Sequence, residues 1–502
     1  MALPRSLPVR TALRLAATWL VLLVSAPPVS GDQSFAVKRV ERPSRPPPPS
    51  PSFRPDARQT QALRAIYKEL VEIDTALSKG STTRAAQAMA ARFRAAGFPP
   101  ADVRVILHPD NAARGNLVVR LRGRGVRRPL LLLAHLDVVE ARKEDWSSGL
   151  DPFRLTERAG YFYGRGSVDD KAMAAVFVAN LIRYKEEGYQ PDRDIIVALT
   201  ADEEGGDWNG VEWLLQHHRT LIDAEIGINE GGGGRYRQGK RLFNAVQASE
   251  KVYQSFSLEV RNKGGHSSLP VRDNAIYQLA AALDRLARYD FPISLNEVTR
   301  AFFRRAAATE TEQVAADMRA IAAGSRDPGA VARLSASAVH NSTLRTTCVV
   351  TQLEGGHAEN ALPQLARAVV NCRILPQQRV EEVERTLARV IADREVRMTR
   401  IREPRPSPPS PLTPAVMKPI EEITSAMWPG VPVIPIMSTG ASDSLYLRRA
   451  GIPTYGVSGI FGDMDDVRAH GRDERLPVTS LWEGQEFLYR LVKALSGSTA
   501  VK

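Results

Sequence analysis

The sequence predicts an α/β protein with a mostly parallel central sheet flanked by helices, because two patterns alternate along the chain. Short apolar runs with strand character occur at 103–107, 116–121, 130–133, 195–200 and 225–229. Stretches with helical spacing of apolar residues lie between or before them, at 62–77, 85–96 and 171–184. Strands that alternate with helices are typical of parallel sheets. Functional side chains of such sheets gather on loops at the carboxyl ends of strands.

A second, smaller layer is expected in the middle of the chain. Residues 253–260 alternate as a strand, and 346–376 hold two further strand-like runs around Asn360. Helices are expected at 275–286 and 381–393. Antiparallel strands with helices on one face form an α+β layer. The predicted organisation is a main domain at 59–251 and 402–502, interrupted by an inserted α+β domain at 252–401.

The N-terminus has the pattern of an export signal. Arg5, Arg10 and Arg14 precede an apolar run at 15–26, and small residues follow it. This predicts a secretory signal peptide at 1–31 and an exported protein, periplasmic or secreted. The run is shorter than the roughly 20 residues of a membrane span, so no stable span is expected after cleavage. An uncleaved anchor is the alternative. Seven prolines in 32–58 predict an extended linker.

Composition excludes several classes of protein. The net charge is +12, but residues 1–58 hold nine Lys/Arg and three acids, which is half of the excess. The remaining chain has no basic stripe with interleaved aromatic residues, so no nucleic-acid partner is expected. A content of 43% hydrophobic and 25% charged residues excludes global disorder. Two cysteines, Cys348 and Cys372, cannot build a four-cysteine zinc site, so a metal site must use His, Asp and Glu.

The first polar cluster follows the apolar run at 130–133. His135 and Asp137 are two residues apart, so in an extended segment their side chains point to the same side. His135 could bind a metal ion while Asp137 holds its other ring nitrogen. On these residues alone, a buried structural histidine is the alternative.

Three further polar clusters also lie at the ends of predicted strands or helices, and one further candidate histidine lies near the C-terminus. Asp169 and Asp170 precede a helix, where they could cap it or bridge cations. Glu203 and Glu204 follow a strand, as a ligand and a general base or as a solvated turn. Glu230 opens a glycine run that lacks the Lys-Ser/Thr of a phosphate loop. The candidates are completed by His470, one of eight histidines.

Together these motifs resemble the M20 family of zinc metallopeptidases. The matching segments are the His-x-Asp, GRGSVDDKA, TADEEGG, INEGG and RAHGRDER, and the resemblance runs from about 59 to 498. Within that family, the sequence is most similar to the branch that contains carboxypeptidase S and the N-fatty-acyl-amino-acid hydrolases. The resemblance implies two zinc ions per subunit, which suits the residue types. The implied ligands are His135 and Glu230 for one ion, Glu204 and His470 for the other, and Asp169 as the bridge.

The resemblance also implies further roles. Asp137 orients His135, and Glu203 is the general base. By this resemblance, the segments 59–251 and 402–502 form a catalytic domain, and the segment 252–401 is a lid and dimerisation domain inserted into it. Its His266 stabilises the oxyanion, in many relatives across a dimer, and Asn360 and Arg373 bind the substrate carboxylate. The loop Ser438, Thr439 and Gly440 lines the substrate pocket. A turn residue and an ordinary strand residue are the alternatives for His266 and Arg373.

The predicted function is hydrolysis of an amide bond next to a free carboxylate, in a small peptide or an N-acyl amino acid. The implied mechanism is Glu203-assisted attack of a water that bridges the two metal ions. One alternative is a specialised deacetylase or desuccinylase, which the export signal disfavours. Another is a non-catalytic scaffold, which the intact ligand set disfavours. The exact substrate, monomer against homodimer, and a Cys348–Cys372 disulfide against two free thiols stay open.

Overall fold

The computed structural model describes residues 45–497, so the predicted signal peptide and the first part of the predicted linker lie outside it. Of the remaining linker residues, Pro47 and Ser50 are buried and most of the others are exposed. Ser50 is buried, and its hydroxyl donates to the carbonyl of Met427. The first helix, α1 (Ala57–Glu72), begins where Asp56 accepts hydrogen bonds from two backbone amides. None of the helices in residues 45–497 combines the length and apolar character that a membrane crossing requires.

A ten-stranded sheet forms the centre of the main part in the described region. Its strand order is β1-β2-β6-β3-β7-β17-β9-β8-β18, with β16 paired to β9. The predicted α/β class is confirmed, but the sheet is mixed and not mostly parallel as the sequence predicted. The neighbours β6, β3, β7 and β17 are parallel, whereas β1, β2 and β9 enter antiparallel pairs. The strands are β1 (Val103–His108), β2 (Asn111–Leu121), β3 (Leu130–His135), β6 (Ile195–Thr200), β7 (Ile226–Asn229), β8 (Gly233–Arg237), β9 (Lys240–Glu250), β16 (Val433–Ser438), β17 (Thr454–Gly456) and β18 (Phe461–Asp463).

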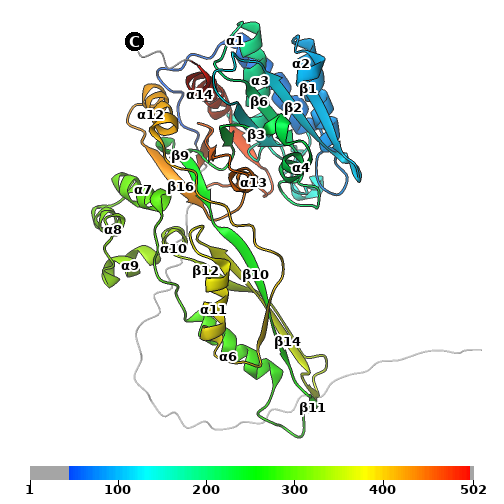
Figure 1. The fold of residues 1–502 in the computed structure, drawn as a ribbon, viewed down its shortest axis with the longest axis vertical. Coiled ribbons are helices and arrows are strands. Elements are labelled where there is room, and N and C mark those ends of the chain that lie inside the picture. Colours follow the sequence, from blue (N-terminus) through cyan, green and yellow to red (C-terminus); the bar gives the residue numbers. More distant parts are fainter. Residues whose placement is uncertain (1–44, 498–502) are drawn as a thin grey trace, which may run out of the picture. The chain divides into compact units, whose positions relative to one another are not determined.

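Helices cover both faces of this sheet (Figure 1). The central strands β3 and β6 are buried at every position and are apolar up to their last residues, His135 and Thr200, because both of their faces are covered. On one face, alternate strand residues pack with α1, α2 (Thr82–Ala95), α3 (Lys171–Glu186), α12 (Pro414–Met427) and α14 (Val478–Ser496). On the other face they pack with α4 (Gly210–His217), α5 (Arg219–Ile222) and α13 (Ser444–Arg449). Helix α3 is buried almost all round, which explains its run of alanines and branched residues.

The inserted segment has its own four-stranded antiparallel sheet and its own core. The strand order is β12-β14-β10-β15, and two helices pack against the sheet. These elements are β10 (Val252–Arg261), α6 (Ala275–Ala287), β12 (Thr347–Gly355), β14 (Leu365–Ile374), α11 (Val380–Ile391) and β15 (Arg397–Arg400). Cys348 and Cys372 lie directly opposite each other on β12 and β14 and form a disulfide. The structure therefore decides between the two open alternatives for these cysteines.

Four helices of the insert pack away from its sheet. They are α7 (Glu297–Ala306), α8 (Glu312–Ala322), α9 (Pro328–Ser335) and α10 (Ala338–Leu344). Their apolar residues share a cluster with Ile434 and Ile436 on β16, a strand of the main sheet. The long stretch between α6 and β12 therefore joins the core beside β16 and does not enlarge the four-stranded sheet.

The remaining elements are short. A three-stranded sheet brings together distant parts of the chain, and a two-stranded pair lies at the end of the β10–β14 ladder (Figure 1). These strands are β4 (Thr156–Arg158), β5 (Tyr161–Tyr163), β19 (Arg475–Pro477), β11 (Gly265–His266) and β13 (Ala361–Leu362). Single 3-10 turns occupy Pro100–Asp102, Lys143–Asp145 and Ala307–Thr309.

Candidate metal centre

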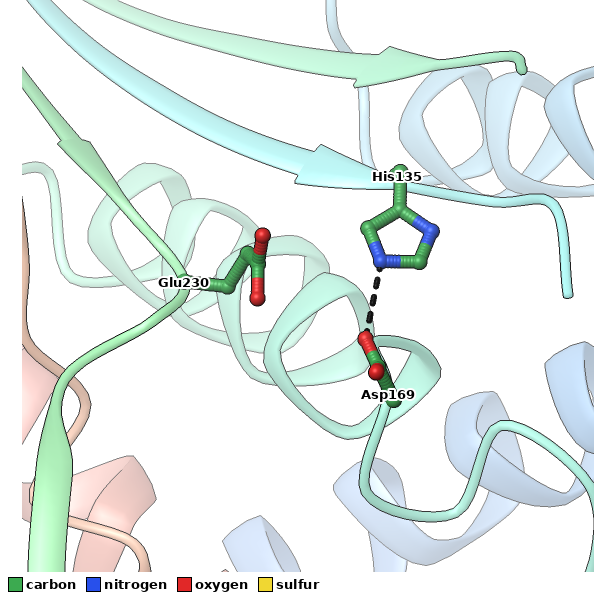
Figure 2. Close-up of side chains that lie close together, drawn as sticks. All are labelled: His135, Asp169 and Glu230. Atoms are coloured by element: carbon green, nitrogen blue, oxygen red, sulfur yellow. Dashed lines mark hydrogen bonds and ion pairs between the residues drawn. The ribbon is translucent and has the colours of Figure 1, made fainter. Parts of the chain in front are cut away.

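Three of the predicted ligands come from different segments of the chain and lie close together in the structure. His135 ends β3, Glu230 follows β7, and Asp169 lies in the loop before α3. One potential ligand atom from each lies within 4.8 Å of the others. Figure 2 shows the three side chains pointing toward a common space, with His135 Nε2 3.0 Å from Asp169 Oδ1. The carboxyl ends of β3 and β7 are neighbours because these strands pair in parallel.

A second group shares Asp169 with the first. It consists of Asp169, Glu204 and His470, again with ligand atoms within 4.8 Å of one another. His470 Nε2 lies 2.8 Å from Glu204 Oε2 and 3.2 Å from Asp169 Oδ2. One oxygen of Asp169 thus faces His135 and the other faces His470. This is the arrangement of a carboxylate that can bridge two cations.

Asp137 holds both His135 and the following acidic segment. His135 Nδ1 lies 3.0 Å from the backbone carbonyl of Asp137 and 3.6 Å from its carboxylate. A carbonyl only accepts, so Nδ1 carries a proton, which leaves Nε2 as the ring nitrogen that can bind a metal ion. The Asp137 carboxylate instead accepts from the backbone amides of Glu203 and Glu204, at 3.1 and 2.9 Å. The predicted orienting role is thus carried by the main chain of Asp137.

Glu203 belongs to neither group of ligand atoms, although it lies between them in the chain. Its side chain is half-buried. Burial raises the pKa of Glu203 well above its usual value, and the charges of Glu230 and Asp443 add to the rise. A carboxylate with a raised pKa that is free of metal ligation suits a general base.

The donor set fits cations. Burial raises the pKa of Glu204 to about 7 and that of Glu230 to about 8, and the charge of Asp169 contributes to both shifts. Several carboxylates held together in a low-dielectric site repel one another unless positive charge lies between them. Imidazole nitrogen and carboxylate oxygen are ligands that zinc accepts. The residues present can therefore hold two metal ions with Asp169 between them.

A buried ion pair that the sequence patterns did not reveal fixes the two ligand loops. Glu474 Oε2 accepts from Arg165 Nη1 at 2.6 Å. The two oxygens of Glu474 also accept from the backbone amides of Gly166, Val168 and Asp169. Arg165 Nη2 in turn donates to the carbonyls of His470 and Gly471, at 3.3 and 3.0 Å. Both residues lie inside the quoted motifs, but 309 positions separate them, and no spacing predicts such a pair.

Asp443 follows the residues Ser438–Gly440 in the predicted pocket loop and is buried. Its carboxylate accepts from Asn209 Nδ2 at 2.7 Å and from Thr200 Oγ1 at 3.3 Å. Thr200 ends β6, the strand that precedes Glu203 and Glu204. Asp443 therefore ties the loop after β16 to the acidic end of β6.

Arg373 and the loop Ser438–Gly440 are brought together. Arg373 Nη1 donates to the carbonyl of Thr439 at 3.2 Å, and the guanidinium lies 4.6 Å from the ring centre of Tyr253. The amide of Gly440 donates to Ser438 Oγ at 3.0 Å. The backbone amide of Lys251 donates to the Ser438 carbonyl at 2.9 Å. Arg373, predicted to bind a carboxylate, thus lies where the insert meets the main sheet.

His266 and Asn360 are brought together elsewhere. His266 lies on β11, which pairs with β13, and the amide of Ser267 donates to the carbonyl of Asn360 at 3.0 Å. Both residues are exposed. The β10–β14 ladder runs from Val252, opposite Ile374, to Arg261, opposite Leu365. At about 3.3 Å per residue, these ladder ends are roughly 30 Å apart. Arg373 lies at one end, and the His266 strand follows the other.

Comparisons with known proteins agree with this geometry. The sequence profile of peptidase family M20/M25/M40 matches residues 131–494. The human N-fatty-acyl-amino acid synthase/hydrolase PM20D1 is 28% identical over 382 residues, which cover 73% of this chain and 74% of the relative. The crystal structure of the M20 family metallo-carboxypeptidase Sso-CP2 from Sulfolobus solfataricus superposes with a TM-score of 0.64 at 17% identity, over 87% of this chain and 99% of that one.

A third relative is described by its metal content. The Bacillus subtilis YXEP protein, a dinuclear metal binding peptidase from the M20 family, superposes with a TM-score of 0.53 at 12% identity, over 88% of this chain and 98% of that one. These structural likenesses show the fold. The profile spans well over half of the sequence and contains His135, Asp169, Glu203, Glu204, Glu230 and His470. The chain belongs to peptidase family M20/M25/M40 and is a hydrolase of that family.

Proposed function

We propose that this protein is a di-zinc hydrolase that cleaves an amide bond next to a free carboxylate, in a small peptide or an N-acyl amino acid. The observation that carries the proposal is the position of Asp169. Its two oxygens face His135 and His470, which belong to different ligand groups. Glu203 stands beside these groups without belonging to either. That combination supplies a place for two cations and a separate base.

The chemistry divides between the metal ions and the protein. When bound, two zinc ions would supply Lewis acidity to a water molecule and to the substrate carbonyl. Glu203 takes a proton from the attacking water, whose oxygen bonds to the carbonyl carbon, and delivers that proton to the leaving nitrogen as the C–N bond breaks. Asp137 keeps His135 in the required tautomer throughout. A positioned general base of this kind increases the reaction rate by roughly 10²–10⁴-fold.

Two neighbouring cations support a substrate that ends in a carboxylate. Lys251 and Arg373 interact, since the positive charge of Arg373 adds to burial in lowering the pKa of Lys251 to about 7. Lys251 Nζ donates to the carbonyl of Arg345 at 2.7 Å. Within residues 45–497, neither cation forms an ion pair with a carboxylate. A bound carboxylate would supply the missing negative charge, and the guanidinium fork suits it.

The names of two relatives indicate the class of substrate. The human relative is named for N-fatty-acyl amino acids, and the Sulfolobus structure for carboxypeptidase activity. Both names describe an amide nitrogen carried by an amino acid with a free carboxylate. We extend that shared feature to this chain.

We further propose a homodimer in which His266 completes the catalytic site of the second copy. His266 and Asn360 lie together and exposed, at the ladder end opposite Arg373. Neither belongs to a ligand group, and the hydrogen bonds of the His266 ring go to Ser268. An imidazole from a second copy can donate to the developing oxyanion.

We also propose that the protein is exported. The pattern at residues 1–31 is one basis, and the Cys348–Cys372 disulfide is a second, because disulfides persist in oxidising compartments. Sequencing the N-terminus of the protein recovered from the native host's extracytoplasmic fraction tests this. A mature end soon after residue 31 is expected, and an intact Met1 in the cytoplasm would contradict it.

The catalytic assignment is tested with purified protein loaded with zinc. About two zinc equivalents per chain are expected, with hydrolysis of some members of a panel of N-acyl amino acids and dipeptides. Glu203→Ala should abolish turnover and keep both metal ions. The matched control is Glu157→Ala, which removes a surface carboxylate paired with Arg64. Wild-type protein that binds no metal, or a Glu203→Ala enzyme with unchanged turnover, would sink the proposal.

A further inference from the structure

A cavity of about 250 Å³ opens beside the metal ligands and is not explained by the amide chemistry alone. Asp169 and Glu230 form part of its wall, so a group in the cavity adjoins the position of the reacting carbonyl. Its other walls come from β8, from the segment 458–469 and from β19. None of the residues that line it belongs to the insert or to the loop Ser438–Gly440. Arg373 and the loop that it contacts are therefore not part of this cavity wall.

The cavity contains a guanidinium without a carboxylate partner. Arg235 lies on β8, is half-buried, and pairs in register with Gly462 of β18. Its Nη1 donates to the carbonyl of Gly234 at 3.2 Å. A Cβ atom at position 462 would lie 3.9 Å from that nitrogen, which is an ordinary van der Waals contact. Among the described residues, no acidic side chain forms an ion pair with Arg235, and burial alone lowers its pKa.

The other two arginines of this cavity share one carboxylate partner. Arg468 and Arg475 both pair with Asp466. Two positions along β8, the exposed Arg237 pairs with Asp465 at 3.0 Å. A partly desolvated cation that lacks a counter-ion is costly, and proteins keep such a group mainly where a ligand supplies the charge. Arg235 is therefore the group in this wall that is prepared for an anion.

Size limits what the anion can be attached to. The cavity volume equals the share of roughly eight water molecules in liquid water, which suits a short chain. The same cavity wall contains the apolar side chains Met173, Ile460 and Leu476 together with Asp169, Glu230 and Arg235. A short acyl chain with an apolar middle and an anionic end matches a wall of this composition.

We propose that Arg235 determines specificity for the acyl side of the substrate, by binding a carboxylate at the end of a short acyl group or acidic side chain. This inference rests on the proposed amide hydrolysis and narrows its substrate class. The substrate then carries a carboxylate at each end, one at Arg373 on the amino-acid side and one at Arg235 on the acyl side. A planar guanidinium can bind the second carboxylate with two parallel hydrogen bonds.

The test compares N-glutaryl-alanine with N-pentanoyl-alanine, which share chain length and differ in the terminal group. In the zinc-loaded wild type, kcat/KM for the glutaryl compound should exceed that for the pentanoyl compound by about 10- to 100-fold, the effect of a charged hydrogen bond. Arg235→Met keeps the aliphatic volume and should reduce this ratio to about one or below. The control Arg237→Met lies on the same strand, loses a surface ion pair, and should keep the wild-type ratio.

A wild-type ratio near one, or a high ratio that Arg235→Met leaves unchanged, overturns the inference while the hydrolase assignment stands. If neither compound is cleaved, calorimetric binding of glutarate and pentanoate to the zinc-loaded proteins decides. Glutarate that binds at least ten-fold more weakly to Arg235→Met, with pentanoate unaffected, supports the subsite, and equal affinities overturn it. Failure of the whole substrate panel counts separately, against the proposed function. Circular dichroism confirms that each variant is folded.

Discussion

Asp169 shows how much one residue contributes to this centre. It has a carboxylate oxygen for each of two imidazoles, and its backbone amide is held by Glu474 at 3.2 Å. A shorter or neutral side chain at this position would disconnect the two ligand groups. Glu203 and Glu204 are neighbours in sequence with different environments, since only Glu204 contacts His470. These different environments suit the different roles that we propose for the two acids, ligand for Glu204 and base for Glu203.

At the substrate end, Arg373→Ala should raise KM for free-acid substrates by about 10- to 100-fold, because a charged hydrogen-bond partner of the carboxylate is lost. The same substrates with an amide in place of the terminal carboxylate should change much less. Steady-state kinetics on matched acid and amide pairs measures the difference.

Two comparisons control this experiment. Arg373→Lys retains the charge and loses the fork, so its KM should fall between those of the wild type and Arg373→Ala. An equal loss for acids and amides would instead indicate that Arg373 only packs on Tyr253, over which it lies at 4.6 Å.

At the scale of elements, the metal ligands depend on loops that follow different strands and are fixed by one ion pair. Glu474 receives Arg165 and three backbone amides of the loop that ends in Asp169. Arg165 holds the carbonyl of His470 from the same place. Because both side chains are buried, water cannot take the place of either partner when the other partner is removed.

Glu474→Gln should therefore weaken both folding and metal binding. It leaves Arg165 buried without its counter-ion, which costs about 3–5 kcal/mol in the free energy of unfolding. The ligand loops lose their anchor, so zinc affinity should fall by about 10- to 100-fold although every ligand is intact. Denaturant unfolding and competition with a chelator measure the two quantities.

The double variant Arg165→Met/Glu474→Gln separates positioning from stability. Removing both charges should restore much of the free energy of unfolding, since no unpaired charge remains. Zinc affinity should stay low, because the NH₂ group that replaces one Glu474 oxygen cannot accept from the loop amides, and the His470 carbonyl has lost its donor Arg165. Recovery of full affinity in the double variant would refute the positioning role. The exposed pair Arg490–Glu486 is the control, and its removal should change neither quantity.

Some of these elements could be predicted from the sequence, and others could not. The strand ends that carry His135, Glu203, Glu204 and Glu230 were predictable, because apolar runs ending in polar residues mark the edge of a parallel sheet. The Arg165–Glu474 pair was not, since its partners are far apart in sequence. The mixed sheet was not predictable either, because β9 and β17 do not reveal their strand direction in their residue pattern.

At the scale of the molecule, the two halves of the predicted substrate site lie in different parts of the insert. Arg373 and Thr439 connect the insert to the main sheet, whereas His266 and Asn360 lie at the opposite ladder end. Among the described residues, no contact joins His266 to a ligand of the metal centre. A second copy of the chain is the partner that could bring an imidazole there, because symmetric dimers exchange identical elements.

Mixing two inactive variants tests that assembly. His266→Ala should lower kcat by about 10²- to 10³-fold, as the loss of an oxyanion donor does. Glu203→Ala is inactive through its own site. In a dimer of one chain of each kind, one site combines an intact Glu203 with an intact His266 from the partner, and the other site lacks both. Random exchange should therefore restore about a quarter of wild-type activity. If light scattering shows dimers, co-purification of differently tagged chains shows that they have mixed, and activity still does not return, His266 acts within its own chain or not at all. A monomeric wild-type enzyme with full activity excludes the shared site.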